Sequence, residues 1–261
     1  MVRSIQVICW NPRLGNLVFC TVCSLIFAWG ATADAKPNPK VSQYAPSDDL
    51  VAQVPFFVDR LEGALKDEAA YDEVQQATVE RDSNTLVVVG LALAMHDQDH
   101  PLKSAAPALI QSARELAENV ADFDAAQAAL AKIKQALAGE IKSDDPVEWA
   151  ALADMSPLMM QVPVIHAPMK RGATDERRFK RQAAQTAGQA ATLAVIAEAS
   201  SYNTDHADEE DIPQWQEFCA QMRDACGEIN AAVRGGDTEK AAAAIVALQK
   251  SCDDCHAVFN P

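Results

Sequence analysis

Two cysteines and a histidine near the end of the chain have the spacing of a covalent cofactor site. Cys252, Cys255 and His256 form the pattern C-x-x-C-H, in which each thiol can bond to one of the two vinyl groups along one side of a porphyrin. The histidine next to the second sulfur is then delivered to the iron as an axial ligand. The pattern therefore predicts one covalently attached haem c per chain.

Two other chemistries use similar residues, and the surroundings favour neither of them. A thioredoxin-like C-x-x-C pair usually opens a helix after a strand, whereas this pair closes an alanine-rich helical run that begins near Ala241. A structural zinc site usually needs four ligands, and the other C-x-x-C pair of the sequence, Cys20 and Cys23, lies in the N-terminal segment over residues 1–35 that we expect to be removed. Cys255 and His256 are also adjacent, so on a helix their side chains point about 100° apart.

The N-terminus has the features of a secretion signal, which we predict over residues 1–35. Arg3 and Arg13 supply positive charge, and the apolar run over residues 17–29 is too short for a comfortable membrane span. Two A-x-A cleavage candidates follow at residues 31–33 and 33–35. An uncleaved anchor is the alternative. Export to the periplasm, or otherwise out of the cytoplasm, suits a c-type haem, because such cytochromes are matured there.

The charge of the chain restricts its partners. Removal of residues 1–35 takes away two of the 22 basic and one of the 37 acidic residues, which leaves a formal net charge of −16. Such a charge argues against nucleic acid and against anionic membrane surfaces, and it favours a redox partner with a basic docking patch. Alanine-rich composition, few aromatic residues and little β-branched alternation indicate an all-α fold.

Helical patterns fill the first half of the chain. A proline-rich linker is expected over residues 36–46, followed by a four-helix bundle over residues 47–140. Ser47 is the expected N-cap of the first helix, in which Leu50, Val54, Phe57 and Leu61 have helical spacing. Further helices are predicted over residues 68–94, 105–120 and 124–137. The short connections between them imply antiparallel neighbours.

The second half repeats the pattern of the first. A further helix is expected to start at residues 144–148, where Pro146 occupies a favoured first position. Residues 53–55 (QVP) recur at 161–163, and Asp99-His100 recurs as Asp205-His206, at offsets of 106 to 108 residues. We therefore predict an internal duplication, with two tandem antiparallel four-helix bundles and a haem-binding bundle over residues 144–261.

The predicted repeat is asymmetric. The last helix of the first half, over residues 124–137, contains no cysteine and no histidine. That half therefore cannot hold a covalent haem by the same chemistry. Its core is expected to be filled by apolar side chains instead, namely Leu86, Val87, Val88, Leu91, Leu93 and Met95.

A C-x-x-C-H motif on the last helix of an alanine-rich four-helix bundle resembles the cytochrome c′ family, the class II c-type cytochromes. The resemblance covers about residues 146–259 and depends on Cys252, Cys255 and His256. It implies that a residue of the bundle's first helix lies over the open face of the haem. Met155 best matches that position and Met159, one turn later, is the alternative. These methionines could also simply pack in the core.

The resemblance carries further expectations about that first helix and about assembly. Pro157 lies between the two methionines, where a proline can break a helix, and the helix is expected to end at Gly172. His166 shares their face and is an alternative ligand. Related bundles often dimerise through their first two helices, so a homodimer is possible, although the fused first half could occupy that surface.

Several other residues have two interpretations. Cys219 and Cys226 are too far apart along one helix for a mutual disulfide, so they are either small buried side chains or partners of another chain. His100 and His206 are expected to be solvated turn residues, with a shared metal site as the alternative. One basic cluster, formed by Arg171, Arg177, Arg178 and Arg181, is expected to be a solvated face that could also pair with haem propionates or with a partner's acids.

Three functions remain compatible with these features. The first is electron transfer by a haem with histidine and methionine ligands. The second is a five-coordinate haem that binds or senses a diatomic gas such as NO or CO. The third is an assembly role, in which the first half docks a partner and the haem is secondary. No nucleophile–base pair and no glycine-rich phosphate loop is evident, so the chain is not expected to be an enzyme.

Overall fold

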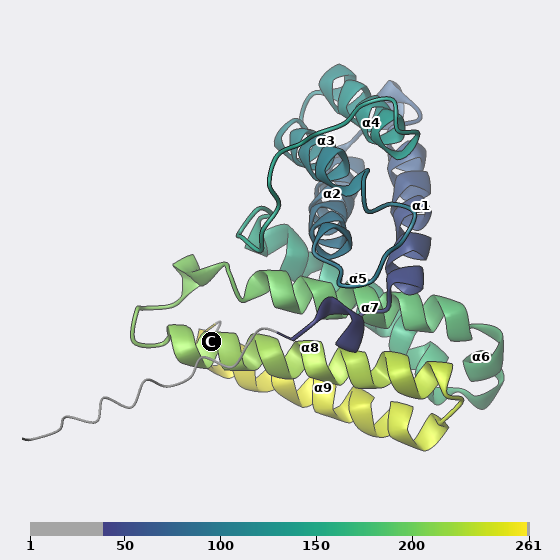
Figure 1. Cartoon of the computed structure of the whole chain (residues 1–261), viewed down its shortest axis with the longest axis vertical. Helices are drawn as coiled ribbons and strands as arrows, with labels where there is room; N and C mark the ends of the chain where they lie inside the picture. Colours follow the sequence, from purple (N-terminus) through teal and green to yellow (C-terminus); the bar gives the residue numbers. More distant parts are fainter. Residues whose placement is uncertain (1–38, 260–261) are drawn as a thin grey trace, which may run out of the picture. The chain divides into compact units, whose positions relative to one another are not determined.

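The computed structural model describes residues 39–259, and within this range it contains nine α-helices, three short 3-10 helices and no strand (Figure 1). The predicted all-α class is confirmed. The predicted signal peptide, residues 1–35, lies outside the described residues. The α-helices are α1 (Ser47–Ala64), α2 (Glu73–Ala94), α3 (Ala106–Glu118), α4 (Phe123–Leu137), α5 (Met155–Thr174), α6 (Glu176–Arg181), α7 (Ala183–Ser200), α8 (Ile212–Arg234) and α9 (Thr238–Phe259).

Local signals account for many of the helix ends. The side chain of Asp72 accepts hydrogen bonds from the backbone N–H groups of Val74 and Gln75 and so caps α2. Asp122 caps α4 in the same way through Ala125. Gly139 follows the end of α4 with a φ of 74°, a conformation that costs glycine little. Side-chain caps thus begin two of the four helices of the first half, whereas α1 and α3 have none.

The helices form two sets of four. Within the first set α1 packs on α2, α2 on α3, and α3 on α4, while α4 returns to α1. The second set repeats this order with α5, α7, α8 and α9, and α9 returns to α5. Helix α6 is a short element between α5 and α7. Each set is therefore a closed four-helix arrangement, and the predicted internal duplication remains a prediction.

The two sets share one hydrophobic core. Helix α1 packs against α7, and α2 packs against both α5 and α7. Buried apolar residues form a continuous cluster from Val41 to Leu248, and the chain from Pro39 onward is one compact unit. Five of the six side chains expected to fill the core of the first half are fully buried, and the sixth, Met95, is partly buried.

The segment predicted as a linker, residues 36–46, requires a correction in its described part. Val41, Tyr44 and Ala45 are buried in the shared core. The backbone N–H and hydroxyl of Ser42 both donate to the carboxylate of Asp97, at 2.9 and 2.7 Å. The prolines were a correct sign of irregular backbone, but the apolar residues between them pack against the fold.

The expected helix start at residues 144–148 is also wrong, because α5 begins only at Met155. Residues before it are held in an irregular path by contacts with other helices. Trp149 stacks on Tyr202 with ring centroids 6.0 Å apart, and the side chain of Asn84 accepts a hydrogen bond of 2.8 Å from the backbone N–H of Asp154. Tertiary contacts thus override the local capping signal.

Helix α5 is continuous through the position where a break was expected. Pro157 is its third residue, where no intrahelical N–H donor is needed. The helix runs two residues past the expected end at Gly172 and stops at Thr174. No helix of the described part of the chain is long and apolar enough to span a membrane.

Candidate haem-binding site

The C-x-x-C-H motif occupies the last two turns of α9. Upstream, Ala241, Ala244, Ile245 and Leu248 are buried and fix the orientation of this helix. Cys252 and His256 are one turn apart and therefore share a face, with Cys255 beside them. Both cysteines are free and partly buried, whereas His256 is exposed.

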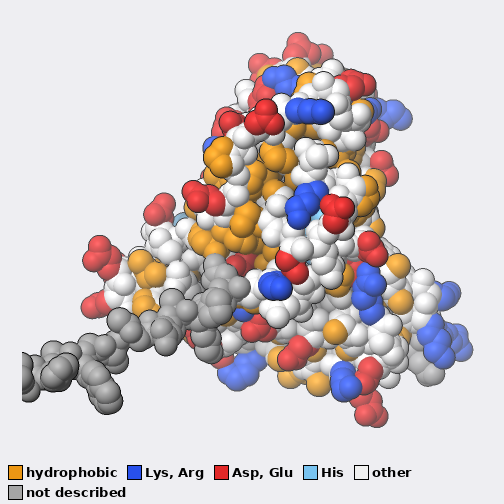
Figure 2. Space-filling view, viewed as in Figure 1, with side chains coloured by type: hydrophobic (Ala, Val, Ile, Leu, Met, Phe, Trp, Pro, Cys, Tyr) orange, Lys and Arg blue, Asp and Glu red, His pale blue; other side chains and the backbone are white. Residues whose placement is uncertain are grey.

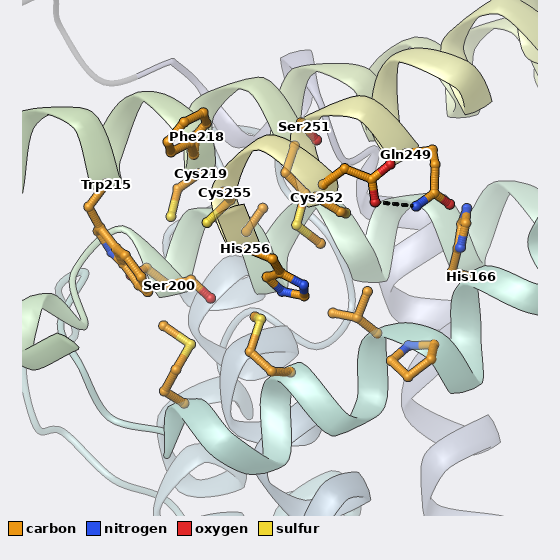
Figure 3. Close-up of a pocket in the computed structure, with 17 residues that line it drawn as sticks. His166, Ser200, Trp215, Phe218, Cys219, Gln249, Ser251, Cys252, Cys255 and His256 are labelled. Atoms are coloured by element: carbon orange, nitrogen blue, oxygen red, sulfur yellow. Dashed lines mark hydrogen bonds between the residues drawn. The ribbon is translucent and has the colours of Figure 1, made fainter. Parts of the chain in front are cut away.

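All three motif residues line one cavity, which α5, α7, α8 and α9 enclose. Its volume is about 290 Å³, close to the lower limit for small-molecule sites. Figure 3 shows the imidazole of His256 extending from α9 into the space, with Cys255 and Cys252 on the same side. A group as large as a porphyrin would therefore have to leave one edge outside the cavity.

The structure brings both candidate methionines to this cavity. Met155 is 8% exposed and packs with Trp215 and Cys219, and Met159 is partly buried against the same cluster. Both line the cavity from α5, together with the motif residues of α9. That one of them lies over the haem remains a prediction, and their positions do not decide between Met155 and Met159.

His166 also lines the cavity and is partly buried. Its Nε2 atom is buried and has no hydrogen-bond partner among the described residues. Burial, and secondarily the charge of Lys170, lowers the pKa of this imidazole. His166 thus offers an imidazole nitrogen at the same cavity, and it remains an alternative ligand to the iron.

Helix α8 supplies a part of the site that sequence reasoning did not assign to the haem, although it considered Cys219 for other roles. Trp215, Phe218, Cys219 and Met222 line the cavity from this helix. The indole N–H of Trp215 donates to the carbonyl oxygen of Ser200 at 2.9 Å, which fixes the ring beside the space (Figure 3). The spacing of these four residues is an apolar helical stripe, and that stripe was the available signal.

The two cysteines of α8 are buried thiols. Cys219 is 8% exposed and Cys226 is fully buried, and both are free. Burial, and secondarily the neighbouring Cys255, raises the pKa of Cys219 to about 12, and burial likewise raises the pKa of Cys226. Because a fully buried sulfur cannot reach another chain, the packing interpretation holds for Cys226 and the intermolecular disulfide does not.

The turn histidines differ from expectation. His206 is exposed, but His100 is buried and its Nε2 lies 2.8 Å from the carbonyl oxygen of Leu93. The expected solvation of His100 is therefore wrong. Its neighbour His96 is also buried and bonds to the carbonyl of Ala45 at 3.1 Å. The described residues contain no group of three or more His, Cys, Asp or Glu that could hold a metal ion.

The basic cluster lies away from the cavity. Arg171, Arg177, Arg178 and Arg181 are exposed on the end of α5 and on α6, and none of them lines the cavity. The expectation of a solvated face is thus met, and pairing with haem propionates finds no support in this arrangement.

The residues present fit a covalent haem. Two free thiols and an exposed imidazole lie on one side of the cavity, and two thioethers and an imidazole lie among its other walls. The remaining lining is mainly apolar, with Val162, Ala197 and Phe218 among it. Comparison with known proteins gives no independent guide, since no family model, no curated protein and no solved structure matches this chain.

Proposed function

We propose that the chain is an exported c-type cytochrome of the cytochrome c′ type, which carries single electrons with one covalent haem. The observation that supports this most directly is the convergence of Cys252, Cys255 and His256 with Met155 and Met159 on one apolar cavity. A chance C-x-x-C-H on a helix surface has no reason to face such a cavity.

The chain's own residues divide the work. Cys252 and Cys255 would hold the cofactor by thioether bonds, and His256 would supply a nitrogen ligand to the iron. Met155 or Met159 would supply a sulfur ligand, which would raise the potential as methionine–histidine ligation generally does. When bound, the haem would supply a one-electron iron couple. The mainly apolar lining would limit the access of water, and the exposed end of α9 would be accessible to a redox partner.

The test is to produce the full chain with a haem-maturation system and to measure its mass and its absorption spectrum. We expect a covalent mass increment of one haem and a Soret band. Replacement of Cys252 and Cys255 by alanine should abolish both. Replacement of Cys219 and Cys226 by alanine is the matched control, because these thiols lie on α8 near the same cavity, and it should leave the covalent increment unchanged. Absence of the increment in the unaltered chain would refute the proposal.

A second function is favoured by an apolar residue of α5 in the cavity wall. Val162 lines the cavity from this helix, and in five-coordinate members of the resembled family an apolar or aromatic residue of the first helix lies over the open haem face. On that alternative the chain binds or senses a diatomic gas. A ferric spectrum with a methionine charge-transfer band supports electron transfer, whereas a high-spin spectrum that shifts with NO or CO supports gas binding.

A further inference from the structure

A second polar pocket lies at the other end of α5, where α6 and the start of α7 meet it. Its volume is about 120 Å³. The polar residues that line it are Arg171, Arg178, Gln182, Gln185, Thr186 and Gln189. No described carboxylate is among them, and none of them lines the cavity beside Cys252.

The surface around this pocket is positively charged. Six exposed basic residues lie on the end of α5 and on α6, namely Lys170, Arg171, Arg177, Arg178, Lys180 and Arg181. None of them forms an ion pair in the described part of the chain, whereas Arg60, Arg223 and Arg234 are each paired with a carboxylate. Figure 2 shows blue side chains gathered at the right-hand edge, where α6 lies. In a chain of net negative charge, this uncompensated cluster needs an explanation.

Buried polar groups of the pocket also have no protein partner. Gln189 is 7% exposed and Thr186 is 2% exposed, and neither side chain makes a hydrogen bond to another described residue. Their polar atoms are not among the solvent-inaccessible side-chain atoms that lack a partner. Both side chains line the pocket, so their amide and hydroxyl groups can hydrogen-bond to a ligand there.

The backbone contributes to the same potential. The pocket follows the first two turns of α7, an 18-residue helix whose N-cap residue Gln182 makes no side-chain capping hydrogen bond. The N-terminal end of a helix carries a partial positive charge and unsatisfied N–H groups, and this favours anions. Two arginines and the side chains of Gln189 and Thr186 thus line one small space near the N-terminal end of α7.

We propose that this pocket binds a compact oxyanion of the size of phosphate. Arg171 and Arg178 would donate charge-assisted hydrogen bonds to its oxygens, since the guanidinium fork matches such oxyanions. The amide of Gln189 and the hydroxyl of Thr186 would complete the inner side. The proposal does not depend on the haem.

To test this, the protein is titrated with inorganic phosphate in chloride buffer at constant ionic strength. Binding is measured by calorimetry and by phosphorus NMR. We expect saturable binding to one site per chain. Arg178→Gln and Arg171→Gln should each weaken it by about tenfold, as loss of one charge-assisted bond implies. Gln189→Leu, which keeps the volume but removes the buried donor, should weaken it while leaving the surface charge unchanged.

Arg177→Gln is the matched control, because Arg177 is exposed on the same short helix but does not line the pocket. It should change the affinity less than twofold. If Arg177→Gln weakens phosphate binding as much as Arg178→Gln, the binding signal reports diffuse electrostatic attraction and the proposal fails. It fails equally if added chloride abolishes phosphate binding to the extent that charge screening alone would. Absence of saturable phosphate binding in the unaltered protein would overturn it equally.

Discussion

The two four-helix sets treat equivalent positions in opposite ways. With the offset of 106 residues that relates Pro107 to Pro213, Leu116 on α3 corresponds to Met222 on α8. Leu116 is fully buried in the shared core, whereas Met222 lines the candidate haem cavity. At the start of the first helices, Met155 stands where the first half has Ser47. At this pair of positions the first set packs a leucine in the core, and the second set places a methionine at the wall of a cavity.

The contact between the halves is nearly symmetric. Gln161 on α5 donates to Asp82 on α2 at 2.9 Å. Its counterpart Gln53 on α1 accepts from Thr192 on α7 at 3.3 Å. Each first helix thus places the same glutamine against the second helix of the other set, as in an isologous dimer interface. This arrangement is what an internal duplication would produce.

Breaking this interface on one side should have the largest effect. Asp82 is fully buried and accepts from both Arg60 and Gln161. Asp82→Ala leaves a buried amide and a guanidinium without their acceptor, so we expect a loss of about 3–5 kcal/mol in the free energy of unfolding. Urea unfolding measures it. The matched Gln53→Ala change should cost about 1 kcal/mol, and equal losses from the two variants would contradict this account of the interface.

The difference in packing between the halves can be tested at one pair of equivalent positions. Leu116→Ala creates a void in a filled core and should cost about 2–5 kcal/mol. Met222→Ala only enlarges an existing cavity, so in the haem-free protein we expect it to cost less than Leu116→Ala. The free energies of unfolding of the two variants decide this, measured on the same haem-free background. A larger loss for Met222→Ala would show that the cavity collapses around that side chain in solution.

The sequence predicted the helical class and the approximate bounds of the first four helices, because each depends on local spacing. The cavity wall from α8 was missed because Cys219 was considered only as a buried thiol or as a disulfide partner. Only the packing of α8 against α7 and α9 gives Trp215 its place. The late start of α5 and the packing of Tyr44 in the core were missed for a related reason. Both depend on contacts with helices that are distant in sequence.

Which of Met155 and Met159 acts as the iron ligand tests how the second half differs from the first. Met155→Leu and Met159→Leu conserve volume and should each cost less than about 1.5 kcal/mol in stability. Only the variant that removes the distal sulfur should lose the methionine charge-transfer band and lower the reduction potential of the holoprotein. If both variants keep the band, neither sulfur is the ligand, and His166→Gln becomes the next variant to measure.

The smallest expected effect concerns the equivalent turns after α2 and α7. Burial lowers the pKa of His100, and its Nδ1 is buried without a partner. The unfolded chain therefore takes up a proton near its usual pKa of about 6.5 that the folded chain resists. This contribution to stability is complete above that pH and is lost as the pH falls below it. His206, in the equivalent turn, is exposed.

Unfolding measured from pH 7.5 to 5.5 tests this difference between the turns. His100→Gln should remove part of the loss of stability on acidification, by no more than about 1.4 kcal/mol per pH unit. His206→Gln, at the exposed turn, is the matched control. A His100→Gln curve that runs parallel to that of the unaltered protein would contradict the lowered pKa of the buried imidazole.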